Sequence, residues 1–190
     1  MDHSEFIRHY LAESRKLLES LDNDRISEAI TWLRRARSKG STIFTCGNGG
    51  SSAIAAQMVV DMVKCASLGK PRRFRMINLS DNVPTLTAYA NDEGYETIFV
   101  EPFRNFARPG DLLLAISGSG DSPNVLAAVE YARQLGCPTI GLTSGLSGQL
   151  KDLVDLPLLV PSNHMGRLED CFFAISHVLA YRFIEETDSA

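Results

Sequence analysis

The chain has 190 residues, of which 44% are hydrophobic and 22% are charged, and its net charge is −4. This length and apolar content are enough to bury the core of a single domain. The negative charge argues against nucleic acid as the main partner, because nucleic-acid-binding proteins usually present a basic face. The one basic cluster, at 70–75, is interpreted as a solvated edge.

The cysteines and the N-terminus bear on the cellular compartment. Cys46, Cys65, Cys137 and Cys171 lack CxxC spacing and lie among apolar residues, so we expect reduced, inert core cysteines. The first residues lack the basic flank and apolar block of a signal peptide, and no apolar run is long enough to span a bilayer. The composition therefore predicts a soluble cytoplasmic protein with no membrane partner.

The first 39 residues predict two helices before any strand. Apolar residues recur at helical spacing over 4–20, and Asp22 and Asp24 restart a second helix that ends at Gly40. Such helices either cover the sheet of their own chain or pack against another subunit, and the sequence leaves both possibilities open.

Strands and helices alternate over the remaining residues, 40–190. The strand-like segments are 42–46, 74–79, 111–116, 138–142 and 154–160, and the helical ones are 51–65, 82–90, part of 95–107, 123–135 and a long last helix at 165–185. This alternation predicts a parallel sheet of about five strands between helical layers, in one α/β domain spanning 1–190. Pro157 indicates an edge position for the last strand.

A glycine-rich loop at 46–52 follows the first predicted strand. Gly47, Gly49 and Gly50 permit close backbone approach, and Ser51 and Ser52 offer hydroxyls to a helix or a ligand. An ordinary turn has the same composition, so this loop alone leaves packing and binding equally open. It does not fit the dinucleotide-binding fingerprint, because Ser52 stands at the position of the third glycine.

The loop at 117–122 is the stronger sign of a binding site. Ser117, Ser119 and Ser122 flank Gly118 and Gly120 where a strand passes into a helix. Hydroxyls, backbone N–H groups and a helix N-terminus can surround a phosphate without any Lys or Arg. An ordinary capped turn needs only one of these hydroxyls, so we expect a phosphate or a phosphosugar here.

Taken together and in order, these motifs resemble the sugar isomerase (SIS) family. The segments that carry the resemblance are CGNGGS at 46–51, AND at 90–92, GDLLLAISGSGDS at 110–122, and 167–177 in the last helix. They are most similar to the phosphoheptose isomerase branch, and the similarity covers nearly the whole chain. The resemblance implies a flavodoxin-like three-layer sandwich that assembles as a homotetramer.

The resemblance also implies a reaction and a set of site residues. Members of that branch interconvert sedoheptulose 7-phosphate and an aldoheptose 7-phosphate through an enediol. Asp61, after the first loop, and His177, in the last helix, match the acid/base pair. The positions that match phosphate- and sugar-binding residues are Asn48, Gly49, Ser51, Asp92, Ser117, Gly118, Ser119, Ser122 and Glu169.

Three positions depart from the pattern of that branch. Gln57 and Asp61 stand where the branch has His and Glu, and Glu169 stands where it has Gln. Residues 57 and 61 still share one helix face. Asp61 is one methylene shorter than Glu, however, and a misplacement of about 1 Å can cost on the order of 100-fold in rate. Glu169 offers a second carboxylate that can compensate.

The same four positions of the branch can hold zinc, and here they are Gln57, Asp61, Glu169 and His177. We therefore expect either no required cofactor or one divalent metal, zinc or similar, bound with one imidazole in place of two. Glu169 and His177 lie about 12 Å apart along one helix. A shared site would more easily draw one of them from a neighbouring subunit, which supports an oligomer.

Two other functions stay open at this point. The missing Glu and His favour a non-catalytic SIS protein that binds a phosphosugar or a protein partner, like the replication-initiator-associating relatives. Another aldose–ketose isomerisation is the third possibility. Taken alone, His177 also fits a core histidine, whereas a carboxylate in so apolar a helix as that of Asp61 is costly unless it is paired, exposed or functional.

Overall fold

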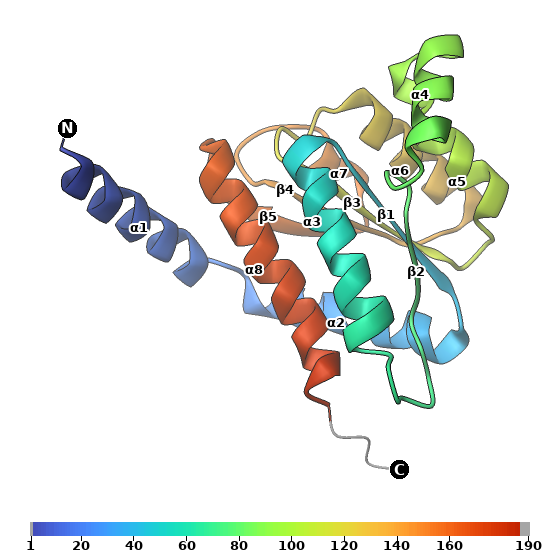
Figure 1. The fold of residues 1–190 in the computed structure, drawn as a ribbon, viewed down its shortest axis with the longest axis horizontal. Coiled ribbons are helices and arrows are strands. Elements are labelled where there is room, and N and C mark those ends of the chain that lie inside the picture. Colours follow the sequence, from blue (N-terminus) through green and yellow to red (C-terminus); the bar gives the residue numbers. More distant parts are fainter. Residues whose placement is uncertain (1, 187–190) are drawn as a thin grey trace.

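Figure 1 shows a computed structural model of the chain, which describes residues 2–186. One sheet of five parallel strands has the order β2-β1-β3-β4-β5. The strands are β1 (Thr42–Gly47), β2 (Arg75–Asn78), β3 (Leu112–Ser117), β4 (Thr139–Ser144) and β5 (Leu156–Val160). Every residue of β3 and β4 is buried, as is typical of parallel strands covered on both faces. The predicted α/β fold is confirmed, and β5 is an edge strand, as Pro157 indicated.

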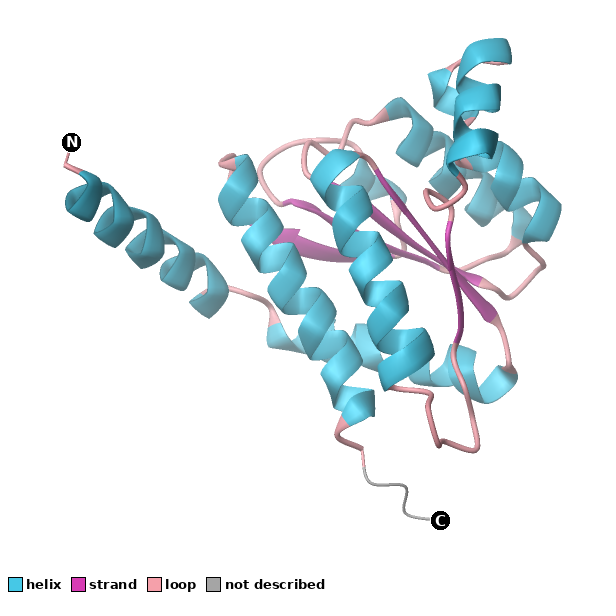
Figure 2. Cartoon of the chain, in the orientation of Figure 1, coloured by secondary structure: helices cyan, strands magenta, loops and turns pink. Residues whose placement is uncertain are grey.

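Helices cover both faces of the sheet, which makes three layers (Figures 1 and 2). One face packs against α2 (Asn23–Lys39), α3 (Gly49–Val60) and α8 (Met165–Ile184), and the other against α5 (Val100–Phe106), α6 (Pro123–Leu135) and α7 (Leu150–Leu153). The sequence did not predict α7. A helix, α4 (Val83–Asp92), and a 3₁₀ turn (Tyr95–Thr97) connect β2 to α5.

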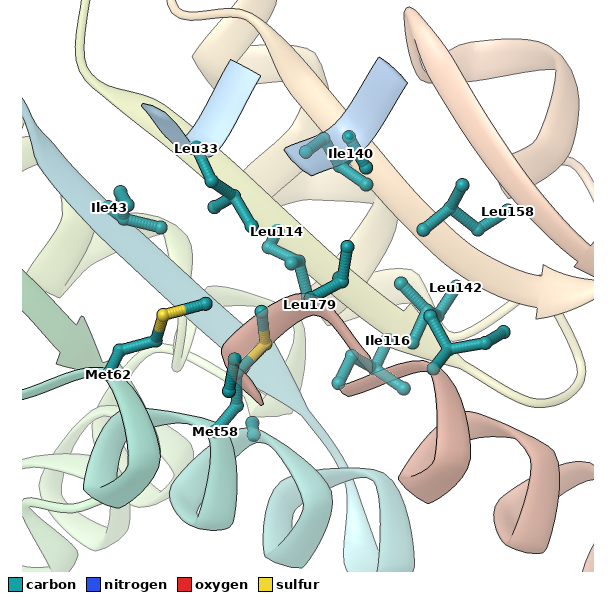
Figure 3. Packing of buried hydrophobic residues seen from close by; sticks show 14 of the residues in the cluster. Leu33, Ile43, Met58, Met62, Leu114, Ile116, Ile140, Leu142, Leu158 and Leu179 are labelled. Carbon is teal, nitrogen blue, oxygen red and sulfur yellow. The ribbon is translucent and has the colours of Figure 1, made fainter. Parts of the chain in front are cut away.

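The two halves of the core follow the two-residue period of the strands. Leu114 of β3 packs with α2, α3 and α8, whereas its neighbour Leu113 packs with α5 and α6. Figure 3 shows the first of these clusters, where Leu114 and Ile116 lie close to Met58 of α3 and Leu179 of α8. This packing fixes α3 and α8 side by side on the sheet.

The helix predicted over 51–65 has two parts. After α3, the backbone continues into a π-helical turn at Asp61–Cys65. Such turns are rare and occur frequently at functional sites. This one begins at Asp61, the residue that the resemblance assigns to proton transfer.

Both predicted N-terminal helices are present, but only one of them covers the sheet of its own chain. Helix α2 covers its own sheet, and Leu33 is fully buried there. Helix α1 (His3–Glu19) extends away from the body, in contact with α8 (Figure 1). Phe6, Ile7 and Leu11 of α1 are 54%, 53% and 62% exposed. We call these three residues the α1 stripe.

The expectation of four core cysteines is wrong for one of them. Cys46, Cys137 and Cys171 are buried, but Cys65 is exposed at the end of the π-helical turn. All four are free thiols. Burial raises the pKa of Cys46 to about 12. Over residues 2–186, no helix combines the length and apolar character that crossing a membrane requires.

Candidate functional site

A pocket of about 270 Å³ opens where β1 and β3 end, at the carboxyl edge of the sheet. Its lining includes Asn48, Gly49 and Ser51 of the first loop, Ser117, Gly118, Ser119 and Ser122 of the second, and Met165 and Glu169 of α8. We call it the serine pocket. It brings together eight of the nine residues matched to substrate binding. Ligands of open α/β sheets bind at this edge, because the loops that follow adjacent parallel strands meet there.

Three hydroxyl groups converge in the serine pocket. Ser117 Oγ lies 3.1 Å from Ser122 Oγ and 3.4 Å from Ser119 Oγ, and it accepts a hydrogen bond from the Gly120 N–H at 3.1 Å. Ser122 is the N-cap residue of α6, yet its hydroxyl makes no capping hydrogen bond. The hydroxyl of Ser122 is therefore available to a ligand.

The serine pocket favours an anion without a cationic side chain. Helix α3 begins at Gly49 and α6 begins at Pro123, so two helix N-termini with their positive dipole ends meet there. The lining residues include no Lys or Arg. A Cβ on Gly118 would lie 2.6 Å from Met165 Sδ, so a larger residue there would displace the Met165 side chain. This arrangement suits a phosphate group.

Asn48 is held in place by two other side chains. Its Nδ2 donates to Asn124 Oδ1 and its Oδ1 accepts from Asn124 Nδ2, both at 2.9 Å. Tyr95 donates its hydroxyl to the same Oδ1 at 3.0 Å. Asn124, Tyr95 and Met165 were not predicted from the sequence. A signal existed for Asn124, a polar residue directly after the serine loop in the first turn of a helix.

Asp61 and His177 face each other across α3 and α8. His177 Nε2 lies 3.8 Å from Asp61 Oδ2. Asp61 is only 6% exposed; its Oδ1 accepts a hydrogen bond from Gln57 Nε2 at 3.1 Å, and its Oδ2 has no hydrogen-bond partner. The His177 side chain is 46% exposed, so the alternative of a core histidine is wrong. We call these three residues the acid/base region.

Apolar side chains surround the acid/base region at the surface. Four of them are exposed by 40% to 50%: Val60, Val63, Val178 and Tyr181. We call them the apolar rim. Contiguous apolar surface of this kind usually marks a contact with another protein or with a ligand.

Within one chain, the acid/base region lies far from the serine pocket. Along α3, Asp61 is twelve residues after Gly49, or about 18 Å. Along α8, His177 is eight residues after Glu169, or about 12 Å. Asp92, the ninth matched substrate residue, lines neither region and borders a separate hollow beside α4. One copy of the chain therefore does not unite the binding and proton-transfer residues.

The four positions matched to a metal are divided in the same way. Gln57, Asp61 and His177 lie together, whereas Glu169 lies at the serine pocket. The described part of the chain contains no cluster of three His, Cys, Asp or Glu side chains that could hold a metal ion. Zinc takes three or four protein ligands. One chain by itself therefore does not fit a zinc ion, and we derive no step through a metal.

The fold and the serine pocket define an α/β protein built to bind a phosphorylated ligand at the carboxyl edge of its sheet. The chain belongs to the SIS domain family, whose profile matches residues 9–144. It is 37% identical over 175 residues to the phosphoheptose isomerase of Chlorobaculum parvum, which covers 90% of this chain and 82% of that relative.

Solved structures give the same assignment. A phosphoheptose isomerase from Francisella tularensis has a TM-score of 0.91 and 29% identity, covering 98% of this chain and 100% of the other. One from Neisseria gonorrhoeae has a TM-score of 0.89 and 26% identity, covering 97% and 100%. The resemblance to the phosphoheptose isomerase branch is confirmed.

Proposed function

We propose that the chain is a phosphosugar isomerase that interconverts a ketose and an aldose phosphate, with sedoheptulose 7-phosphate as its substrate. The observation that carries this proposal is the serine pocket, where three hydroxyls and two helix N-termini meet beside a second polar loop. The similarity to phosphoheptose isomerases over most of the chain supports it. We keep the cytoplasm as the proposed compartment.

In this proposal, the serine pocket holds the phosphate. The hydroxyls of Ser119 and Ser122 donate to phosphate oxygens, and the dipole ends of α3 and α6 favour the negative charge. Glu169 and Asn48 line the same pocket and bind sugar hydroxyls, with the Glu169 carboxylate as an acceptor. The phosphate thus fixes the position of the carbon chain.

Asp61 and His177 divide the proton transfers. The Asp61 carboxylate removes a proton from C1 of the ketose while the carbonyl oxygen on C2 gains one, which gives an enediol. The proton then returns to C2 as the hydroxyl on C1 loses its own, and the imidazole of His177 moves the protons on the two oxygens. Asp61 Oδ2 is buried and has no hydrogen-bond partner, while Gln57 holds Oδ1, so this oxygen must become accessible to the substrate when it acts as the base.

We propose further that the complete site forms between copies of the chain, in a homotetramer. An extended heptose phosphate reaches about 10 Å from C1 to phosphorus at bond lengths near 1.5 Å, which is less than the roughly 18 Å between Gly49 and Asp61 along α3. A second copy seated on the apolar rim or the α1 stripe would bring its own serine pocket close to this Asp61.

The same assembly bears on the metal. Glu169 of a second copy would join Asp61 and His177, and the three side chains are a donor set that a divalent ion accepts. The proposal of an optional zinc or similar ion therefore depends on the proposal of a shared site. Removal of metal by a chelator, followed by zinc addition, tests it through the loss and recovery of bound zinc measured by mass spectrometry.

Direct assay tests the reaction. Incubation with sedoheptulose 7-phosphate is expected to yield an aldoheptose phosphate, and no turnover of any five- to seven-carbon phosphosugar, with zinc added, would overturn the proposal. The shared site has a separate test. Asp61→Asn and Ser119→Ala/Ser122→Ala should each be impaired at low substrate concentration, the first in kcat and the second in KM. Mixing and reassembling the two variants should restore part of the activity at that concentration, because some sites then combine both intact halves. A mixture with no gain over the two variants contradicts the shared site alone.

One observation favours the alternative that the chain binds a phosphosugar without converting it. The 3.8 Å between His177 Nε2 and Asp61 Oδ2 exceeds the length of a hydrogen bond. In that case a phosphosugar raises the melting temperature, no turnover occurs, and the Asp61→Ala variant shows the same stabilisation.

A further inference from the structure

A second pocket, of about 240 Å³, lies at the opposite edge of the sheet from the serine pocket. Trp32, Arg35 and Lys39 of α2 form one wall, and Ser41, Gly110 and Pro138, just before β1, β3 and β4, form the other. We call it the α2 pocket. The proposed isomerase reaction uses none of these residues.

The two cations of the α2 pocket have no anionic partner among the described residues. Over residues 2–186, neither Arg35 nor Lys39 takes part in an ion pair or a side-chain hydrogen bond. They are four residues apart on one helix face, where two like charges repel each other. Asp111, between the lining residues Gly110 and Leu112, forms no ion pair with them; its carboxylate accepts from the backbone N–H groups of Thr42 and Arg108, at 2.7 and 2.8 Å.

The helix dipole explains only part of this arrangement. A cation in the last turn of α2, such as Lys39, interacts favourably with the negative helix end. That effect does not require Arg35 one turn earlier on the same face, nor both cations beside an indole ring. An anion bound between the two side chains would relieve their repulsion and take up the planar donor fork of Arg35.

Trp32 gives the α2 pocket a flat apolar surface. The ring packs partly against the core of α2, α3 and α8, and it also lines the pocket together with Pro138. A pocket lined by an indole ring and a proline ring suits a planar ring. Its volume lies below the 300–1,000 Å³ that is typical of sites for drug-sized ligands, so it holds one ring system and not a dinucleotide.

We propose that the α2 pocket binds a nucleoside monophosphate, with the base between Trp32 and Pro138 and the phosphate between Arg35 and Lys39. The dianionic phosphate matches the two cations, and the planar base matches the indole and proline rings of the lining. The site is separate from the serine pocket, because β1 and β3 each run about 20 Å between the two. Both strands begin at the α2 pocket and end at a loop of the serine pocket, so a ligand here is placed to act on the other site.

Trp32 is the only tryptophan of the chain, so its fluorescence reports on this pocket directly. The intact protein is titrated with AMP, with excitation at the red edge of the indole band, where the nucleotide does not absorb. Saturable quenching is expected. Adenosine, which lacks the phosphate, should bind about 10- to 100-fold more weakly, as expected from the loss of hydrogen bonds to a charged group.

Variants distinguish the α2 pocket from the serine pocket. Arg35→Ala/Lys39→Ala should weaken AMP binding at least tenfold, whereas Arg133→Ala, at a different surface hollow, should leave it unchanged. Ser119→Ala/Ser122→Ala should also leave the quenching unchanged. Three results would overturn the proposal: no saturable quenching at millimolar AMP, equal binding by the Arg35/Lys39 variant, or loss of quenching in the serine-pocket variant. Circular dichroism checks that each variant is folded.

Discussion

The serine pocket and the acid/base region are built by the same two helices, yet one chain completes only the first. The amino-terminal turns of α3 and α8 supply Gly49 and Glu169 to the serine pocket, and later turns supply Asp61 and His177 to the acid/base region. In the serine pocket the Ser117 hydroxyl lies within 3.4 Å of the hydroxyls of Ser119 and Ser122. In the acid/base region Asp61 Oδ2 has no partner, and the surroundings are exposed and apolar.

This difference follows from where each region lies on the fold. The serine pocket forms at a sheet edge, where loops after adjacent strands meet in any single copy. The acid/base region lies on the α3–α8 layer, where Asp61 is buried, His177 is exposed and the apolar rim surrounds them. In the proposed function, phosphate binding is a property of one chain, while the chemistry requires a second copy to cover this surface. Substitutions in the two regions should therefore have different kinetic signatures.

The largest effect is expected from Asp61→Asn. This change keeps the shape of the side chain but removes the base, so kcat should fall by about 10²- to 10⁴-fold, with KM nearly unchanged because the phosphate is held elsewhere. Steady-state kinetics with sedoheptulose 7-phosphate measure both constants. Asp61→Glu, which keeps the carboxylate and moves it by one methylene, should lose no more than about 100-fold. An equal loss in the two variants would mean that Asp61 is not the base.

Ser122→Ala should have a smaller effect, and it should act on KM and not on kcat. One charge-assisted hydrogen bond to phosphate is lost, which corresponds to roughly 1.5–3 kcal/mol and to about a 10- to 100-fold rise in KM. The kcat value should change little. Ser20→Ala, at the end of α1, removes a hydroxyl that bonds only to Leu17 O and serves as the control. A fall in kcat at constant KM would contradict the division between binding and chemistry.

The same division explains how much the sequence revealed. The strand pattern predicted five parallel strands, because apolar runs such as β3 have few other solutions in an α/β chain. The serine loop was recognisable because its residues are adjacent in the sequence. Asn124 and Tyr95 were missed, because their bonds to Asn48 span 76 and 47 residues of sequence and arise only when the fold brings them together.

Residues 57–65 show which features the sequence predicts and which it does not. The spacing of Gln57 and Asp61 predicted one shared face, and their hydrogen bond agrees with this. The π-helical turn that starts at Asp61 left no recognisable pattern in the sequence, and neither did the exposure of Cys65. Both depend on how the end of α3 packs against α8. Local propensity does not determine such packing.

Gln57→Leu should lower kcat by a smaller amount than Asp61→Asn. It removes the donor to Asp61 Oδ1, at 3.1 Å, and leaves the base intact but less firmly oriented. A hydrogen bond of roughly 0.5–1.5 kcal/mol corresponds to a decrease in kcat of about 2- to 10-fold, with KM unchanged. Gln57→Glu tests the sign of the interaction, because a carboxylate beside Asp61 repels it and should reduce kcat further. An unchanged kcat in both variants would show that Gln57 does not position the base.

Labelling of the cysteines compares how closed the two regions are, and it requires no substitution in either of them. Cys46 lies two residues before Asn48, and burial raises its pKa to about 12, so at neutral pH it stays a protonated thiol rather than the reactive thiolate. Cys65 lies four residues after Asp61 and is exposed. A thiol reagent should therefore label Cys65 alone in the folded protein and all four cysteines after unfolding, as peptide mass spectrometry can measure.

Raising the pH toward 9 should leave Cys46 unlabelled, because that pH is still far below its pKa. Labelling of Cys46 in the folded protein would mean that the strand leading into the serine pocket opens, and that this region is no more closed than the surface around Asp61.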